Sequence, residues 1–276
     1  MKPTTLKQAL NRKLPSKELS LVKRAFDQIG DIAILEIPDS LKKKEKIIAE
    51  TLLTLHPHLK VVCKKASKHS GVFRLQKVKI LAGEKRKETE YRENNIRLKL
   101  NIEKCYFSPR LATERLRITN QIKKGESILV MFSGIGPYPL GFSKNASPKD
   151  ITAIEINPTA HKYALANKRL NKDTKVMFLK GDVKKVVPRI KKKFDRILMP
   201  LPKGAENFLH LIWKVSKKGT IVHFYDFEEE LNIKKARKKV IEAAKKAKKK
   251  IKIKKVVKCG QYGPRKFRLC LDFNIQ

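Results

Sequence analysis

One short segment, residues 104–117, combines side chains that could carry out acid–base chemistry. Its sequence, KCYFSPRLATERLR, contains a single carboxylate, Glu114, together with three arginines and an aromatic pair that includes Tyr106. A positioned carboxylate can act as a general base, and a nearby guanidinium can stabilise developing negative charge. The residues alone favour a structural interpretation instead, in which Glu114 forms a salt bridge with an arginine of the same helix.

A second candidate site follows directly, where an apolar strand runs into a loop with two glycines. The segment ILVMFSGIGPY brings a predicted buried strand to Gly134 and Gly136, as in a doubly wound sheet that binds a nucleotide. Glu155 ends the next predicted strand 21 residues after Gly134, close to the spacing of about 20 residues expected for a carboxylate that binds ribose hydroxyls. Asp182 ends the third predicted strand, where it or Val183 could meet an adenine edge.

The glycine loop is not a dinucleotide fingerprint. Pro137 follows Gly136, and no third glycine arrives at the required spacing, so S-adenosylmethionine is a better candidate cofactor than NAD. The predicted strand order with a terminal hairpin also fits the methyltransferase variant of this fold, although a fold alone does not fix a function. The structural alternative is a pair of turn glycines beside two acids that cap helices.

The elements that must position these sites change in character along the chain. Before about residue 105, KELSLVKRAF and KKKEKIIAETLL have helical spacing, whereas IAILEI, LKVVCKK and VFRLQKVKIL resemble short strands. Within YRENNIRLKLNIEKCYF, apolar residues alternate from Ile96 to Ile102, as in a half-buried strand. This part of the sequence predicts an α+β domain.

After Arg117, apolar strands alternate with helix-like stretches. The predicted strands are SILVMF, ITAIEI, KVMFLKGD, FDRILMPL and GTIVHFYDF. Such alternation is typical of a parallel sheet with helices on both faces. A lysine-rich helix, roughly residues 229–249, is predicted next, followed by IKKVVKC and FRLCLDFNI as an antiparallel pair at the sheet edge.

The composition points to a polyanionic partner and to the cytoplasm. Lysine and arginine total 66 against 26 acidic residues, a net charge of +40 that favours nucleic acid. Heat adaptation is the alternative, but it predicts that glutamate rises with lysine, and here it does not. Four scattered cysteines without a CxxC pair argue against zinc and disulfides, and no apolar run approaches the ~18 residues of a membrane span. We expect a cytoplasmic monomer without metal or membrane contact.

Several motifs in order strongly resemble the archaeal and eukaryotic type of tRNA (guanine-37-N1)-methyltransferase. They are YFSPRLATER, MFSGIGPY, EINP, GDV and LPKGAENFL, preceded by GVFR and LAGEKRKETEYREN. The resemblance implies an α/β fold with a class I (Rossmann-like) methyltransferase domain, residues 106–276, behind a smaller α+β RNA-binding domain, residues 1–105. It also implies S-adenosyl-L-methionine as cofactor and the tRNA anticodon arm as partner. Many members carry a further N-terminal domain that grips the tRNA elbow, and residues before about 70 are expected to be too few for it.

The resemblance also implies roles for individual residues. Glu114 would be the general base, Arg74 would steady the guanine, and Tyr106 would lie beside the methyl donor. The implied cofactor contacts are Tyr106, Arg115, Phe132, Gly134, Glu155, Ile156, Asp182, Val183 and Pro200. Guanine N1 carries a proton about as acidic as that of a phenol, so its methylation needs a base and a group that stabilises charge on O6. Taken alone, Arg74 is better explained as a phosphate contact and Tyr106 as a core aromatic.

Two positions depart from the family pattern. Val130 stands where an acid is usual, and Pro200, Leu201 and Pro202 stand where the family has Asn-Leu-Pro, whose asparagine is thought to orient the target base. A slower or altered reaction is the favoured consequence, and replacement by Asn207 or His223 is the alternative.

Three functions therefore compete. The first is methylation of N1 of guanine 37 in the anticodon loop. The second is the related aminocarboxypropyl transfer of wyosine synthesis, and the third is a tRNA-binding protein with impaired catalysis.

Overall fold

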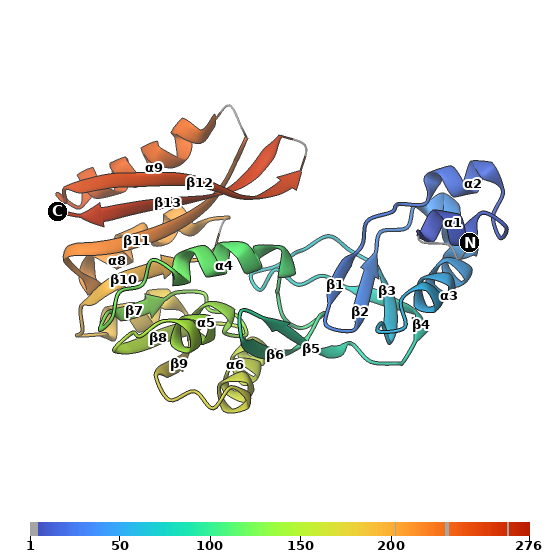
Figure 1. Ribbon diagram of the computed structural model, residues 1–276. Coiled ribbons are helices and arrows are strands. Elements are labelled where there is room, and N and C mark those ends of the chain that lie inside the picture. Colours follow the sequence, from blue (N-terminus) through green and yellow to red (C-terminus); the bar gives the residue numbers. More distant parts are fainter. Residues whose placement is uncertain (1–4, 202, 230–231, 264) are drawn as a thin grey trace. The chain divides into compact units, whose positions relative to one another are not determined.

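The computed structural model describes residues 5–201, 203–229, 232–263 and 265–276, which form two compact units (Figure 1). The first unit comprises Met1–Arg92 and Lys99–Pro109, and the second comprises Glu93–Leu98 and Arg110–Gln276. The chain passes between the units within β5 (Glu88–Glu93), within β6 (Ile96–Asn101) and between Pro109 and Arg110. Strands β5 and β6 form a two-stranded sheet. As predicted from its alternating pattern, β6 buries Ile96, Leu98 and Leu100 and exposes the residues between them.

The first unit is an α+β fold around a four-stranded sheet of order β1-β2-β3-β4. Its strands are β1 (Asp27–Ile29), β2 (Ile32–Leu35), β3 (Val61–Lys65) and β4 (Val78–Gly83). Its helices are α1 (Leu6–Leu10), α2 (Ser16–Leu21), the 3₁₀ turn η1 (Asp39–Lys44) and α3 (Glu45–Leu55). Helix α3 contributes Ile48, Ala49 and Leu52 to a core that also contains residues of β2 and β3.

Two predicted elements of this unit are shorter than expected. The helix predicted over KELSLVKRAF ends at Leu21, because Val22 is already extended. The strand predicted from Val72 begins only at Val78, because residues 70–75 form a tight turn that Ser70 and Leu75 close by mutual hydrogen bonds. Arg74 adopts a left-handed conformation in that turn, with φ of 54°.

The second unit is built on a seven-stranded sheet of order β12-β13-β11-β10-β7-β8-β9. The strands are β7 (Ser127–Val130), β8 (Asp150–Glu155), β9 (Val176–Lys180), β10 (Phe194–Met199), β11 (Ser216–Glu229), β12 (Ile251–Gly263) and β13 (Lys266–Ile275). Strands β7 to β11 pair in parallel, whereas β13 is antiparallel to both β11 and β12. The predicted parallel sheet with an antiparallel pair at its edge is confirmed.

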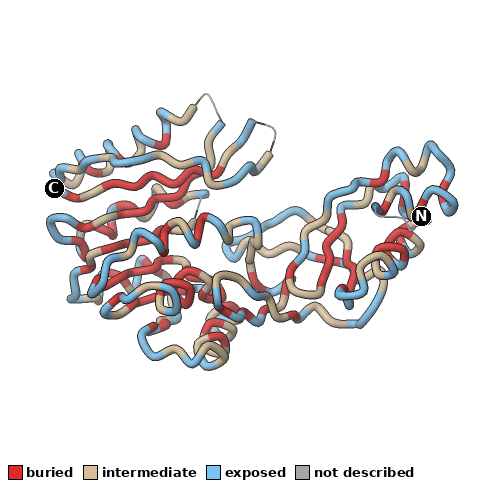
Figure 2. Tube along the Cα trace, viewed as in Figure 1, coloured by how far each residue is buried: buried red, intermediate tan, exposed pale blue. Residues whose placement is uncertain are grey.

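Helices lie on both faces of this sheet, and its central strands are buried (Figure 2). They are α4 (Ala112–Thr119), α5 (Pro137–Asn145), α6 (Pro158–Leu170), α7 (Val183–Val186), α8 (Leu209–Val215) and α9 (Ile233–Lys246), with 3₁₀ turns η2 (Pro109–Leu111), η3 (Val187–Arg189) and η4 (Ala205–Phe208). The lysine-rich helix was predicted to begin near Glu229, but Glu229 ends β11, where it pairs with Lys266 of β13. None of the described helices combines the length and the apolar composition of a membrane span.

Candidate active site

The carboxyl ends of the parallel strands form the edge of the sheet at which most of the predicted site residues lie. Val130 at the end of β7 pairs with Leu198, and Met199 at the end of β10 pairs with Phe224. The residues that follow these strand ends therefore come out at one edge, which is where open α/β sheets bind ligands. Val130, which stands where the family has an acid, is fully buried.

The glycine loop between β7 and α5 has three residues in the left-handed region of backbone conformation. They are Phe132, Gly134 and Gly136, with φ of 57°, 58° and 92°. A Cβ atom added to Gly136 would lie 2.8 Å from Cζ of Phe178, so this position has room only for glycine. Pro137 then begins α5, where its missing N–H costs no helical hydrogen bond.

Glu155 fastens this loop to the end of β8. Its Oε2 accepts a hydrogen bond from the Gly134 N–H at 2.7 Å, and its Oε1 accepts one from the Asn157 N–H at 2.7 Å. Asn157 caps α6, which fixes the chain directly after the strand. Burial raises the pKa of Glu155, and the backbone donors oppose that shift.

The loop has the polar groups that a nucleoside cofactor requires. The Glu155 carboxylate has about four lone-pair sites and receives backbone hydrogen bonds from Gly134, Asn157 and Ile156, so a site remains that a ribose hydroxyl could use. Ser133 Oγ is buried and has no hydrogen-bond partner among the residues that the structure describes. A buried hydroxyl without a partner is costly, and a polar ligand group at the loop would satisfy it.

The other predicted cofactor contacts lie along the same edge. Asp182 follows β9 and caps α7 by accepting a hydrogen bond from the Lys184 N–H at 2.8 Å. Val183 is buried behind it, whereas Ile156, after β8, is 38% exposed and offers an apolar surface. Pro200 follows β10 and is half-buried, and Pro202 of the same motif lies outside the described residues.

Glu114 is held at the same edge by two donors. Its carboxylate receives the Arg117 guanidinium in a two-point contact, at 2.7 and 2.8 Å, and the Tyr225 hydroxyl at 2.6 Å. Tyr225 directly follows Phe224, the partner of Met199, so this contact places the carboxylate level with the end of β10. The salt bridge considered from sequence is therefore present, and it uses Arg117 rather than Arg110 or Arg115.

Arg115 faces another partner. Its guanidinium forms a two-point ion pair with Glu93, and both side chains are almost fully buried. The aromatic ring of Tyr138 lies 6.0 Å away from the same guanidinium. A contact between Arg115 and a cofactor stays a prediction.

Arg74 and Tyr106 come together in the first unit. The Arg74 guanidinium carbon lies 5.0 Å from the centre of the Tyr106 ring, and the His69 ring meets that ring edge-on at 5.3 Å. His69 donates from Nδ1 to the Arg74 carbonyl at 2.9 Å, and burial lowers the pKa of His69. Sequence reasoning missed His69, because an isolated histidine outside any motif gives no signal.

The two residues considered as replacements for the absent asparagine have different surroundings. His223 is fully buried, and both of its ring nitrogens are engaged, by Asp272 and Arg196. Asn207 lies in η4 with its side chain exposed. His223 therefore cannot turn toward a base without leaving two partners.

A doubly wound sheet that ends in an antiparallel pair, with a glycine loop fastened to a buried carboxylate, defines a class I methyltransferase that uses S-adenosylmethionine. The family comparisons agree. The TRM5/TYW2 methyltransferase domain matches residues 89–253, and the TYW2 N-terminal domain matches residues 6–86. The chain belongs to the TRM5/TYW2 methyltransferase family, whose members are tRNA-modifying enzymes, which confirms the family, the fold class and the cofactor expected from sequence.

Three members of the family illustrate how similar this chain is to proteins with a named activity or a solved structure. The tRNA (guanine(37)-N(1))-methyltransferase Trm5b of Pyrococcus abyssi is 36% identical over 281 residues, which cover 99% of this chain and 81% of that protein. The tRNA 4-demethylwyosine(37)-methyltransferase Taw21 of Saccharolobus solfataricus is 35% identical over 216 residues, 75% of this chain and 82% of that protein. The solved structure of aTrm5 in complex with tRNALeu is 32% identical, with a TM-score of 0.85 over 100% of this chain and 79% of that one.

Proposed function

We propose that this protein transfers a methyl group from S-adenosyl-L-methionine to N1 of guanine 37 in tRNA. The observation that carries the proposal is the position of Glu114, a buried carboxylate held by two donors at the sheet edge that also carries the glycine loop and Glu155. A carboxylate fixed in this way is suited to remove a proton from a ring nitrogen. The name of the Trm5b relative supports the same reaction.

In the proposed reaction the cofactor supplies a methyl group on a positively charged sulfur. Glu114 accepts the N1 proton, the N1 electron pair forms the new bond to the methyl carbon, and the carbon–sulfur bond breaks to leave a neutral thioether. The Arg74 guanidinium stabilises the negative charge that gathers on O6 of guanine. Glu155 holds the ribose, and Tyr106 is proposed to lie beside the methyl donor.

The proposed partner is the anticodon arm of tRNA. A net charge of +40 gives strong attraction to phosphates, and a related solved structure contains tRNALeu. Because a base inside a stacked loop cannot reach a buried carboxylate, guanine 37 must be turned out of its stack to react.

A second candidate is methylation of 4-demethylwyosine at position 37. The Taw21 relative, named for that substrate, is 35% identical, against 36% for Trm5b. Pro200 favours a changed substrate, because proline offers a carbonyl but no side-chain donor where the family has an asparagine.

Nucleoside mass spectrometry separates these functions. The protein is incubated with labelled S-adenosylmethionine and tRNA that carries guanine, adenine or 4-demethylwyosine at position 37. A labelled methyl on guanine 37, absent with adenine 37, supports the proposal. Methylation of 4-demethylwyosine alone supports the second candidate, transfer of a larger group supports an aminocarboxypropyl transferase, and no transfer supports a binding protein.

The role of Glu114 is tested by Glu114→Gln. Glutamine preserves the size of the side chain but cannot take up the proton, so single-turnover methyl transfer should slow by roughly 10²–10⁴. Cofactor and tRNA affinities should stay nearly unchanged. An unchanged rate would exclude Glu114 as the base.

A further inference from the structure

A continuous chain of polar side chains, all buried except the half-buried Arg117, runs from Glu114 across the sheet. Arg117, whose guanidinium binds Glu114, also donates from Nη1 to Asp272 at 2.7 Å. Asp272 in turn accepts a hydrogen bond from His223 at 2.6 Å, and Arg196 lies 2.7 Å from the other ring nitrogen of His223. The chain ends at Glu126, which binds Arg196. In order, its members are Glu114 and Arg117 of α4, Asp272 of β13, His223 of β11, Arg196 of β10 and Glu126, directly before β7.

The hydrogen bonds fix the protonation of His223. Arg196 is a donor, so Nε2 of His223 must accept, and the single proton of the neutral ring therefore sits on Nδ1 and points at Asp272. Burial, with Arg196 and Arg117 nearby, lowers the pKa of His223. Burial raises the pKa of Asp272, but the His223 hydrogen bond and the Arg117 guanidinium outweigh it and hold that pKa well below its ordinary value.

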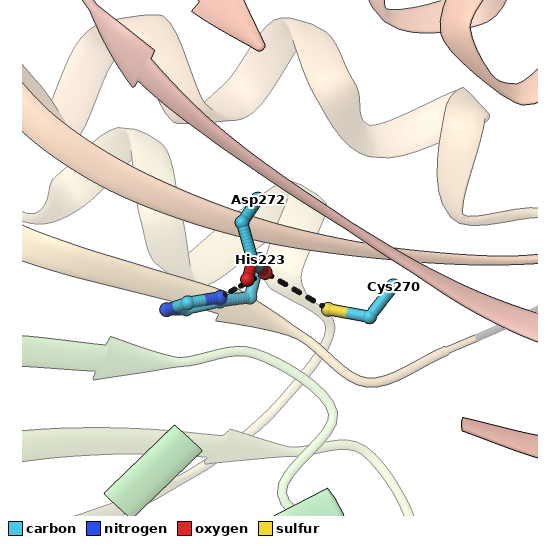
Figure 3. Close-up of side chains that lie close together, drawn as sticks. All are labelled: His223, Cys270 and Asp272. Carbon is cyan, nitrogen blue, oxygen red and sulfur yellow. Dashed lines mark hydrogen bonds and ion pairs between the residues drawn. The ribbon is translucent and has the colours of Figure 1, made fainter. Parts of the chain in front are cut away.

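His223, Asp272 and Cys270 also resemble a set of metal ligands. Figure 3 shows the three side chains converging, and their ligand atoms lie within 4.8 Å of one another. Asp272 and His223, however, already contact the guanidinium groups of Arg117 and Arg196. A metal cation would have to displace these two positive groups, so the arrangement favours a chain of ion pairs over a metal centre.

Arg117 is the charged group that hydrogen-bonds to Glu114, and Asp272 is the acid that hydrogen-bonds to Arg117. Arg115 and Arg268 also carry charge near this cluster, beside Tyr138 and Cys259. Tyr138 of α5, Tyr225 of β11, Cys259 of β12 and Cys270 of β13 also lie close, and burial raises the pKa of each, to about 12 for Cys259. These four groups stay neutral at working pH. Arg117 therefore supplies the positive charge in contact with Glu114, and Asp272 supplies the negative charge that offsets it.

We propose that Asp272, held by His223 and Arg196, is a positioning residue that orients Arg117 and offsets its charge, so that Glu114 is aimed correctly and remains able to accept a proton. The inference rests on the proposed role of Glu114 as the base. Without Asp272, the unopposed guanidinium stabilises the deprotonated carboxylate and makes it a poorer proton acceptor. The Arg117 side chain, 22% exposed, would also lose the partner that fixes its plane.

The variant Asp272→Asn tests the inference, because it keeps the shape of the side chain and removes the charge. Single-turnover methyl transfer to tRNA should slow by about 10- to 100-fold, by analogy with the loss of an outer partner that orients a metal ligand. The acid limb of the pH–rate profile should move to lower pH, and affinities for S-adenosylmethionine and tRNA should not change. A merely structural role would not move that limb.

A double-mutant cycle with Glu114→Gln provides the decisive comparison. If Asp272 acts through Glu114, adding Asp272→Asn to Glu114→Gln should change the rate by no more than about twofold. If the two effects multiply, or if the pH limb stays in place, the inference is overturned. Should Asp272→Asn fail to fold, Arg117→Lys, which keeps the charge but loses the two-point contacts, should show the same coupling to Glu114.

Asp226→Asn is the matched control. Asp226 is an equally buried acid of β11 whose ion-pair partner is Lys239 at 2.6 Å, outside the chain that contains Glu114. Its rate and pH limb should equal those of the unaltered protein, and an equal shift in this variant would overturn the inference. Failure of the inference can be told apart from failure of the proposed function. If the proposed function is wrong, the unaltered protein makes no methylated guanine, or Glu114→Gln leaves the rate unchanged. If only the inference is wrong, both of those results stay as expected and only the Asp272→Asn results differ.

Discussion

Replacing Glu155 with glutamine should separate the binding role of the glycine loop from its structural role. Two backbone N–H groups, of Gly134 and Asn157, each point at one oxygen of Glu155 from 2.7 Å. Glutamine has one oxygen and one amide nitrogen, so one of the two N–H groups would face another donor. A buried donor left without a partner costs about 1–3 kcal/mol, so the free energy of unfolding should fall by that amount.

The same change should weaken cofactor binding. A displaced glycine loop and a missing ribose acceptor together should raise the Kd for S-adenosylmethionine by at least about tenfold, which corresponds to about 1.4 kcal/mol. Burial raises the pKa of Glu155 above its usual 4.5, so in the unaltered protein cofactor binding should strengthen as pH rises through that pKa. Glu155→Gln should remove this pH dependence.

Isothermal titration with S-adenosylmethionine and urea unfolding measure these two effects. Asp173→Asn is a matched control, because Asp173 accepts a single backbone hydrogen bond, from the Val176 N–H at 2.8 Å, which asparagine preserves. That variant should stay within about 0.5 kcal/mol of the unaltered protein, as surface substitutions usually do. If Glu155→Gln changed neither the free energy of unfolding nor the Kd for S-adenosylmethionine, the proposed link between the loop, the carboxylate and the cofactor would be refuted.

Three further predictions concern the loop, the buried chain and the partner. Gly136→Ala should lower the free energy of unfolding by about 1–3 kcal/mol more than Gly125→Ala in urea titrations, because both have positive φ but only Gly136 lacks room for a Cβ. Burial lowers the pKa of His223 below 6.5, so the stabilisation from its neutral ring is fully present above pH 6.5 and is lost as pH falls. The free energy of unfolding should therefore drop by at most about 1.4 kcal/mol per pH unit, and His223→Asn should flatten that slope. Binding to tRNA should weaken with salt at a log–log slope of roughly −0.7 to −0.9 for each phosphate neutralised, and a flat titration would contradict the charge argument.

The sequence determined the local elements around the glycine loop. Hydrophobic periodicity and glycine spacing identified β7, β8 and the antiparallel pair at the sheet edge. The 21-residue spacing singled out Glu155 as a ribose ligand, which stays a prediction, and the structure adds that Glu155 also binds the Gly134 N–H. These features depend on chain-local geometry: strand length, the position of a turn, and the edge at which parallel strands end. Where an element end depended on a partner, as for β11 and Lys266, the local pattern placed it wrongly.

Only the tertiary structure decided which groups surround Glu114. Three arginines lie near it in sequence, but Arg115 pairs with Glu93, whereas Arg117 reaches both Glu114 and Asp272. Asp272 is 155 residues from Arg117 and belongs to no motif, so no local pattern could connect them. The physical reason is that helical spacing restricts which neighbours a side chain can meet, whereas burial of a charge requires a particular partner that the packing of distant strands supplies.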